Sequence, residues 1–340
     1  DDLEVYEICN PSKDKLEEIC DLRQPVIFDY AVSGDGGGMG EETIEFRRSV
    51  DLMGIKQNYG AFDVKVKNIK DTHQPADSEL YVPLTLSSAH QLMKADTASK
   101  LISEKNIDFL EETGIIKRFQ YSDDFLRPPL VSTCDYDYTF ASEGAETQLQ
   151  YSCCYRNYFM PIQGKAKIIL IPPKSTKYLY AKTDYEAFEF VSPVSPWNVQ
   201  QMYKSDYAKI KTLEVELVPG KIAFIPAYWW YSIKYSNEPD TILCGFTYNT
   251  IMNVVANVPN WILYFIQQQN RNTTMALQFP QNPTTGDLYV ADNAITYVWT
   301  GVAWDSSTPI HNGTAYYYDV GGRANTVFTS LDNSLDGGTA

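Results

Sequence analysis

The chain places its apolar residues in two different patterns, and these divide it into parts. In the first third, helical spacing and strand-like alternation take turns. Gly114 stands where the last of these helices is expected to end. The pattern predicts helices at 13–22, 87–94 and 100–114, and strands at 24–30 and 61–69.

From about Tyr136 the pattern becomes a succession of short apolar runs broken by Gly and Pro. Strands at this spacing predict a sandwich or a barrel. A long helix at 250–270 follows, and its apolar side is wider than one core face needs. This wide apolar side has two interpretations. The helix packs against the rest of the chain or, more specifically, forms part of a dimer interface. The expected strands are 148–153, 155–162, 166–171, 213–217, 223–225, 229–235 and 242–248.

After Asn272 the composition changes to Asn, Thr, Gly and Asp, with a few short apolar runs. This predicts a small meander of two or three strands, with a boundary near 271–283. The chain is therefore expected to divide into three parts. They are an N-terminal α/β portion at 1–120, a barrel core with its closing helix at 121–272, and a β-rich tail at 273–340.

Composition narrows the classes of function. The 340 residues are 44% hydrophobic and 14% aromatic, and the formal net charge is −15. Nucleic-acid binding and binding to an anionic membrane both need clustered Lys and Arg, which this chain lacks, so neither partner is expected. No apolar run is long enough to span a bilayer. The six Cys show no Cys-x-x-Cys pair, which favours reduced thiols.

Three blocks of sequence resemble the JmjC and factor-inhibiting-hypoxia type of cupin, over roughly 20–265. Residues 147–152 stand where the family has Thr-Pro-Leu-His-Tyr-Asp, and residues 156–173 match its Asn-Phe-Phe segment, glycine and Pro-Pro strand end. Residues 218–231 match Pro-Gly-Asp-x-Leu-x-Ile-Pro-x-x-Trp-Trp-His. The resemblance implies a mainly β fold with flanking helices, a double-stranded β-helix of the jelly-roll kind, followed by a small β module.

The resemblance also implies an iron site, and the residues depart from it. The family holds Fe(II) with two His and one carboxylate, and these positions fall on Gln150, Tyr231 and Ser152. The family's lysine for 2-oxoglutarate falls on Ala166, with Lys165 and Lys167 expected to point to the other face. Neutral amide, phenol and hydroxyl groups are poor substitutes for imidazole and carboxylate. A site without metal or cofactor is expected, with Fe(II) and 2-oxoglutarate as the alternative.

The Trp-Trp-Tyr block has a structural interpretation and a ligand-binding one. In the first, Trp229 and Trp230 alternate across a strand, one in the core and one under helices, and the Tyr231 ring fills the old metal cavity. In the second, the barrel keeps a small-molecule pocket. Its possible lining would be Thr147, Asn157, Trp229 and Trp230.

Other candidate chemistry is weak. His73, His90 and His311 have no carboxylate at a ligand spacing, so each is expected to be a surface or satisfied structural histidine. The pairs Asp123–Asp124 and Glu111–Glu112 are expected on solvated turns and helix faces. Five glycines within 34–40 predict a flexible surface loop, because no Lys-Ser/Thr follows as in a phosphate loop.

Residues 283–290 and 297–304 and an Asp-Gly-Gly repeat resemble small β modules of marine phage virion and fibre proteins, and the Tyr-Trp-Trp-Tyr wording resembles cupins of large DNA viruses. These resemblances imply a virion protein assembled in the host cytoplasm, whose partners are other proteins, such as capsid or tail proteins, in an oligomer. Whether 275–340 belongs to the same gene product stays open. The favoured hypothesis is a degenerate cupin with a structural or protein-interaction role. The alternatives are a 2-oxoglutarate-dependent protein hydroxylase with atypical ligands and a non-catalytic ligand-binding cupin.

Overall fold

The structure is a computed structural model that forms two compact units, 1–264 and 265–340, each described here by itself. The second unit contains a four-stranded antiparallel sheet, with β16 (Leu288–Val290), β17 (Thr296–Trp299), β18 (Trp304–Ile310) and β19 (Thr314–Tyr318) in that order. The residues described are 5–9, 11–29, 39–69, 81–185, 188–237, 240–275, 284–286, 288–290, 296–301, 304–310 and 314–318.

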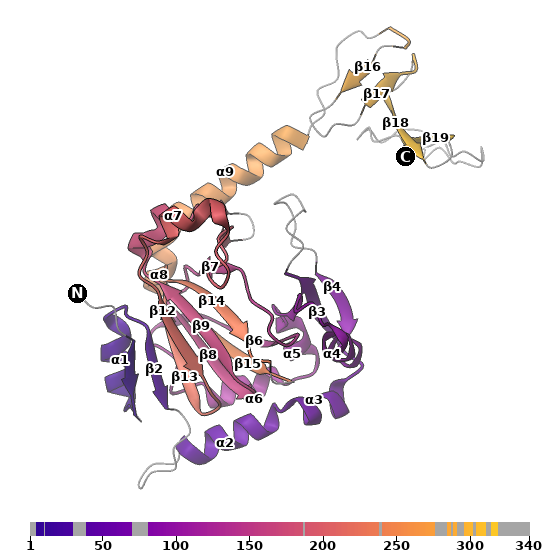
Figure 1. Cartoon of the computed structure of the whole chain (residues 1–340). Helices are drawn as coiled ribbons and strands as arrows, with labels where there is room; N and C mark the ends of the chain where they lie inside the picture. Colours follow the sequence, from indigo (N-terminus) through magenta and orange to yellow (C-terminus); the bar gives the residue numbers. More distant parts are fainter. Residues whose placement is uncertain are drawn as a thin grey trace. The chain divides into compact units, whose positions relative to one another are not determined.

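The first unit is built on two β-sheets that share a core (Figure 1). In sheet order, the nine-stranded sheet has β1 (Tyr6–Ile8), β2 (Val26–Asp29), β13 (Lys221–Pro226), β8 (Arg156–Gln163), β15 (Ile242–Thr250), β6 (Val131–Ala141), β5 (Leu101–Ser103), β3 (Asp63–Asn68) and β4 (Val82–Thr85). The six-stranded sheet has β10 (Lys182–Asp184), β11 (Glu189–Ser192), β7 (Leu149–Tyr151), β14 (Trp230–Tyr235), β9 (Ala166–Ile171) and β12 (Leu213–Leu217).

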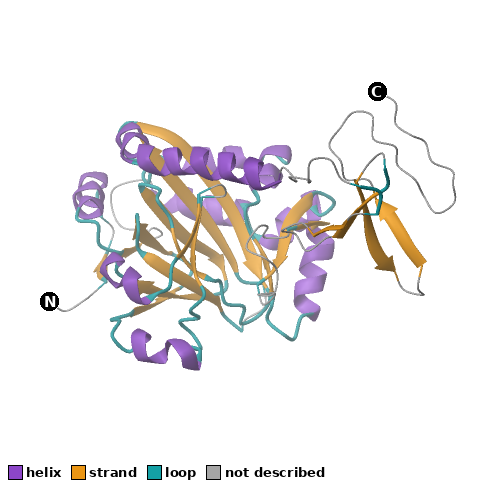
Figure 2. Cartoon of the chain, turned by 90° about the horizontal axis from the view of Figure 1, so that it is seen from above, coloured by secondary structure: helices purple, strands orange, loops and turns teal. Residues whose placement is uncertain are grey.

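Helices lie at the periphery of these sheets (Figure 2). None of the helices in the described part of the chain combines the length and apolar character needed to cross a membrane. The α-helices are α1 (Lys13–Asp21), α2 (Met39–Ser49), α3 (Leu52–Tyr59), α4 (Leu86–Ala95), α5 (Ile107–Glu112), α6 (Ile116–Ser122), α7 (Lys204–Tyr207), α8 (Ile251–Ala256) and α9 (Val258–Met275), and the 3₁₀-helices are η1 (Pro173–Tyr178) and η2 (Gln201–Tyr203).

Several helices begin at a side chain that accepts a backbone hydrogen bond, as their sequences require. Ser12 accepts from the Lys15 amide at 3.2 Å, and Thr250 accepts from the Asn253 amide at 3.2 Å. The second of these caps turns the chain directly from β15 into α8. The closing helices are thereby attached to the central strand of the larger sheet.

Alternation along the strands sorts side chains into two cores. On β15, Phe246 and Tyr248 point to the outer core, which lies between the nine-stranded sheet and its helices. Leu243 points to the inner core, which lies between the two sheets, together with Ile168 and Leu170 of β9. Where both faces of the larger sheet are covered, as along β13 and most of β15, the strands are mostly apolar rather than half polar.

Most of the predicted elements are confirmed, and so is the fold class. Two predicted helices are wrong in detail. The segment 100–114 opens with β5, since Ile102 pairs with Ala141 and is buried, and α5 begins only after Lys105, whose φ is 58°. The segment 250–270 is two helices that meet at Asn257, followed by Pro259 in the first turn of α9.

Three further expectations have different outcomes. Gly114 does end α5, with a φ of 72°. The described residues of the tail form four strands, whereas the sequence predicts two or three. The glycine-rich loop at 34–40 falls largely outside the described residues.

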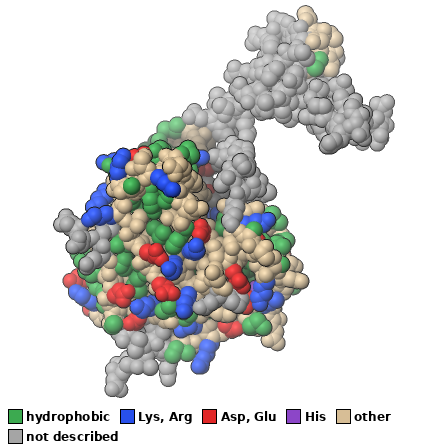
Figure 3. Space-filling model, in the orientation of Figure 1, with side chains coloured by type: hydrophobic (Ala, Val, Ile, Leu, Met, Phe, Trp, Pro, Cys, Tyr) green, Lys and Arg blue, Asp and Glu red, His purple; other side chains and the backbone are tan. Residues whose placement is uncertain are grey.

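The surface of the first unit carries mixed charge. Over the face drawn in Figure 3, Lys and Arg side chains are interspersed with Asp, Glu and apolar groups rather than gathered in one patch. The formal net charge of the chain is −15. The absence of a nucleic-acid partner stays a prediction that this distribution supports.

Asp123 departs from the prediction of a solvated turn, because its side chain is completely buried in the outer core, while Asp124 beside it is exposed. The Asp123 carboxylate accepts hydrogen bonds from the hydroxyls of Tyr136 at 2.6 Å and Tyr248 at 3.0 Å. It also accepts one from the Arg127 guanidinium at 2.8 Å. One buried carboxylate thus joins α6, β6 and β15.

We expect Asp123→Ala to lower the free energy of unfolding by about 3 kcal/mol, because it leaves two buried phenols and a guanidinium without their acceptor. Chemical denaturation followed by circular dichroism measures the loss. Asp124→Ala, at the exposed neighbour, is the matched control and should change stability by less than about 0.5 kcal/mol. Equal losses in the two variants would contradict the role of the buried carboxylate.

Candidate functional site

Two of the three positions that correspond to iron ligands meet inside the barrel. Gln150 of β7 pairs with Tyr231 of β14 across the six-stranded sheet, and its amide Nε2 donates to the Tyr231 hydroxyl at 3.4 Å. The Tyr231 ring is 8% exposed and packs against Phe159 of β8, with ring centroids 5.4 Å apart. The aromatic ring therefore bridges from one sheet to the other in the inner core.

The protonation of Tyr231 follows from this position. Burial raises the pKa of its phenol, and the negative charge of Glu104 adds to the rise. The amide of Gln150 works in the opposite direction without cancelling the shift. The phenol is thus neutral at physiological pH, and a neutral phenol is a poor ligand for a divalent metal.

Ser152, the third position, is directed to its own loop. Its hydroxyl accepts a hydrogen bond from the Cys154 amide at 3.0 Å, and its carbonyl accepts one from the Tyr228 amide at 2.8 Å. Tyr228 has a φ of 66°, a left-handed conformation in the turn that leads into β14. The structure brings Gln150 and Tyr231 together, while Ser152 serves as a local turn residue.

The position of the family's cosubstrate lysine is apolar. Ala166 is 1% exposed in the inner core, where β9 lies between β12 and β14. Lys165 and Lys167 are both exposed, and Lys167 pairs with Glu214 at 2.8 Å. The expectation that both lysines point away from the barrel interior is correct.

The two tryptophans lie on opposite faces of the six-stranded sheet. Trp229 joins the inner core and donates its indole N–H to the Arg23 carbonyl at 3.1 Å. Trp230 is fully buried on the other face beneath η1, where it donates to the Thr176 hydroxyl at 2.8 Å. Both indoles have the partner that a buried Trp needs, as the structural interpretation predicts.

The remaining pocket candidates are engaged in backbone contacts. Thr147 accepts a hydrogen bond from the Ile233 amide at 2.8 Å, which ties the chain ahead of β7 to β14. Asn157 is buried and donates to the Ile225 carbonyl at 3.3 Å, which links β8 to β13. Their role as ligand contacts stays a prediction.

Whether these three positions could bind iron depends on the ligand atoms that their side chains offer. Gln150, Ser152 and Tyr231 supply an amide, a hydroxyl and a neutral phenol, and none of these is the imidazole or carboxylate of a 2-His-1-carboxylate site. Within the described residues, no three side chains of His, Cys, Asp or Glu gather closely enough to hold a metal ion. The residues at these positions therefore do not fit the group that the resemblance implies.

The loop after Ser152 is held by a row of asparagines that the sequence reasoning missed. Asn249, Asn253, Asn257 and Asn260 follow each other at helical spacing from the end of β15 through α8 into α9. Asn253 donates to Asn249 at 2.8 Å, and Asn260 donates to Asn257 at 3.0 Å. We call these four residues the asparagine ladder.

The asparagine ladder contacts Cys153 and Cys154, which are adjacent in the chain. Asn253 and Asn257 donate to the Cys153 carbonyl at 3.2 and 3.4 Å. Asn260 approaches the Cys153 sulfur at 3.8 Å, and Asn249 approaches the Cys154 sulfur at 3.7 Å. All six cysteines of the chain are free thiols, including this adjacent pair.

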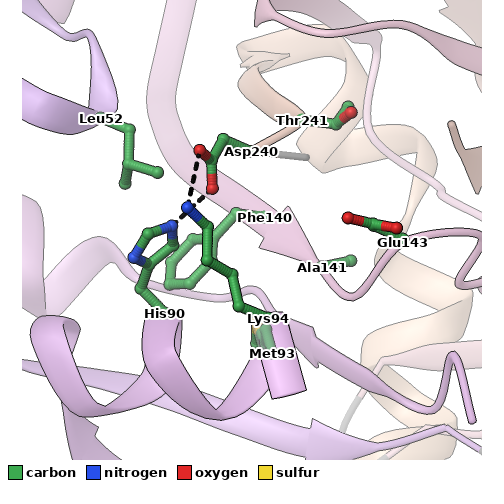
Figure 4. A pocket seen from close by; sticks show the side chains of 9 residues that line it. All are labelled: Leu52, His90, Met93, Lys94, Phe140, Ala141, Glu143, Asp240 and Thr241. Atoms are coloured by element: carbon green, nitrogen blue, oxygen red, sulfur yellow. Dashed lines mark hydrogen bonds and ion pairs between the residues drawn. The ribbon is translucent and has the colours of Figure 1, made fainter. Parts of the chain in front are cut away.

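His90 is a satisfied structural histidine, as predicted. Its Nε2 lies 2.5 Å from Asp240 (Figure 4). The ammonium group of Lys56 lies 2.9 Å from its Nδ1. Since an ammonium group can only donate, Nδ1 accepts and Nε2 carries the proton toward Asp240. Lys94 also reaches Asp240, at 3.2 Å. Burial tends to raise the pKa of Asp240, but the hydrogen bonds from His90 and Lys94 hold it below its ordinary value.

The hollow beside His90 has a volume of about 20 Å³, room for about one water molecule, so no substrate fits there. His73 and His311 lie outside the described residues.

We expect Asn257→Ala to lower the free energy of unfolding by about 1 kcal/mol, because it removes the hydrogen bonds that Asn257 makes to the Cys153 carbonyl, the Asn260 side-chain amide and the Tyr228 hydroxyl. Burial and the neighbouring Cys154 raise the pKa of Cys153 to about 12, so its thiolate is scarce at neutral pH. Maleimide labelling of Cys153 at pH 8 should therefore be slow, and faster in the variant.

Mass spectrometry of the labelled peptides measures both rates. Asn198→Ala changes an exposed asparagine and is the matched control, for which labelling of Cys153 should not change. If Cys153 of the Asn257→Ala protein is labelled no faster than in the unaltered chain, the asparagine ladder does not cover the thiol.

Comparison with known proteins finds sequence similarity over part of the chain. Residues 127–257 match the sequence profile of the family described as "Cupin-like domain". HSPB1-associated protein 1 of Rattus norvegicus and of Homo sapiens are each 28% identical over 102 residues, which is 30% of this chain and 21% of theirs. The homolog of Danio rerio is 30% identical over 93 residues, 27% of this chain and 20% of its own.

The chain thus matches only about a fifth of the length of these curated relatives. The cupin part of the predicted resemblance is confirmed, whereas the viral type and the phage modules stay predictions. The matched segment runs from the start of β6 to the end of α8, and it includes the positions of Gln150, Ser152 and Tyr231. Residues 127–257 therefore form a cupin-like domain.

Proposed function

We propose that this chain is a catalytically degenerate cupin that acts as a structural and protein-interaction component. The observation that carries the proposal is the Gln150–Tyr231 pair, because a buried neutral phenol packed on Phe159 occupies the place where the family's distal histidine would meet iron. With Ala166 at the lysine position, the cation that the family places there for the 2-oxoglutarate carboxylate is missing.

A contact surface supports the interaction role. The helices α8 and α9 expose a row of large apolar side chains, and the sequence from 251 to 270 contains no Asp, Glu, Lys, Arg or His. Met252 is 70% exposed and Val255 is 61% exposed. Exposed apolar rows of this extent mark contact sites between proteins. The row, here called the α8–α9 face, is Ile251, Met252, Val254, Val255, Val258, Trp261, Ile262 and Leu263.

Self-association is the contact that this face fits best. The chain carries a formal charge of −15, so two copies repel wherever their acidic surfaces meet. The α8–α9 face has no charged side chain, and two copies that meet there bury apolar area without placing like charges opposite each other. The resemblance of the tail to virion modules supports a place for the resulting oligomer in a virus particle.

The first test is for metal and turnover. The full chain, purified and reconstituted with Fe(II) without oxygen, is expected to hold far less than one iron per chain and to form no succinate from 2-oxoglutarate. Elemental analysis and succinate detection measure the two quantities. Iron at one equivalent together with 2-oxoglutarate-dependent succinate would establish a hydroxylase with atypical ligands and overturn the proposal.

The second test is for assembly. The full chain is expected to sediment as an oligomer, and Val255→Glu to shift it toward the monomer, because the substitution buries an unpaired charge in the contact. Analytical ultracentrifugation measures the distribution. Met202→Glu is the matched control, since Met202 is 73% exposed on η2, is not a residue of the α8–α9 face, and gains the same charge. Dissociation by both variants, or by neither, would speak against this interface.

A further inference from the structure

The two sheets of the first unit end unevenly along one side. The nine-stranded sheet continues past β13 with β2 and then β1, whereas the six-stranded sheet ends at β12 in the described part of the chain. The strands β1 and β2 therefore extend beyond the edge of the opposite sheet. Figure 1 shows β1 and β2 next to β12.

A groove of about 440 Å³ lies along this side, and it is lined from both sheets. Its apolar part reaches the inner core, since Ile27 of β2 and Val215 of β12 belong to that core and Val5 packs against it. The full lining is Val5, Glu7, Ile27, Leu213, Glu214, Val215, Glu216, Val218 and Lys221.

One wall of the groove is the free edge of β12. The strand pairs with β9 from Leu213 to Leu217, and the described chain places no other strand beside it. In an antiparallel pair, alternate residues of an edge strand direct their N–H and C=O groups outward, where they can pair with a further strand. Val215 and Leu217 face the inner core, while Glu214 and Glu216 face solvent.

We propose that this groove binds an extended basic peptide of another protein by strand addition to β12. A strand of about five residues would match the length of β12. Its inward side chains would be apolar and would cover Ile27 and Val215. Its outward side chains would be Lys or Arg, opposite Glu214 and Glu216 in cross-strand pairs.

The charges of the lining favour this occupant over a second copy of the chain. Three carboxylates line the groove, at Glu7, Glu214 and Glu216. Lys221 pairs with Glu7 at 3.4 Å and Lys167 of β9 pairs with Glu214 at 2.8 Å, so the carboxylates exceed these ammonium groups by one. Two copies paired through β12 would bring Glu214 and Glu216 of one copy opposite the same residues of the other, which is destabilising. The groove shares no residue with the iron-ligand positions or the α8–α9 face, so its test is independent of theirs.

The experiment measures binding of a labelled six-residue peptide, with alternating lysine and valine, to the full chain by fluorescence polarisation. Hydrogen–deuterium exchange then shows where it binds. We expect saturable binding and slower exchange of the amides at 213–217. A peptide with alternating glutamate and valine, and a lysine–valine peptide with one N-methylated central residue, should each bind at least about fivefold more weakly, through lost charge pairing and a lost ladder hydrogen bond.

Glu216→Lys is expected to weaken binding of the lysine–valine peptide about fivefold, because it replaces attraction by repulsion in one cross-strand pair. Glu111→Lys, at an exposed position on α5, is the matched control and should leave binding unchanged. Equal binding of the three peptides, or protection elsewhere than 213–217, overturns the proposal. So does protection, in the free chain, of the amides within 213–217 that do not bond to β9. If that protection is independent of concentration, the chain's own segment fills the groove, and if it grows with concentration, a second copy does.

Discussion

Strand β15 is buried on both faces, and this constraint organises the first unit. It pairs with β6 on one side and β8 on the other, so every backbone group along most of its length is used within the sheet. Most of its side chains therefore pack in one of two hydrophobic cores. Phe246 lies in the outer core and Leu243 in the inner core. The helices that cover the nine-stranded sheet pack on the outer core, and the closing helices begin where β15 ends.

The same constraint explains which parts of the fold the sequence predicts. Strands with regular alternation or a continuous apolar run leave strong local patterns, and β3, β9 and β12 lie where those patterns place them. Asp123 could not be predicted, because its phenol partners are 13 and 125 residues away, and a pair of adjacent carboxylates has no local sign of burial. The sequence does not distinguish β5 from the start of a helix, because three residues are too few to show a periodicity.

At the candidate site, resemblance gave the positions and the structure gives the contacts. The chain departs from the family's residues at Gln150, Ser152, Tyr231 and Ala166, and these four departures are physically consistent with one another. A lysine at the position of Ala166, which is 1% exposed, would be a buried cation with neither metal nor cosubstrate beside it, and such a charge is strongly destabilising. A phenol at Tyr231 fills interior volume and needs one polar partner, which Gln150 provides. The asparagine ladder was visible as a helical spacing, but its target, the Cys153 carbonyl, lies about a hundred residues earlier in the chain.

The uncharged run of α8 and α9 has a consequence for how the protein responds to its medium. Contacts that bury apolar side chains without charge strengthen in sulfate or phosphate at high concentration, because such salts are excluded from protein surfaces. Contacts between carboxylates and ammonium groups weaken as ions screen them, with a Debye length of about 8 Å at physiological ionic strength. Ionic strength would therefore act in opposite directions on the self-association proposed for the α8–α9 face and on the peptide binding proposed for the groove beside β12.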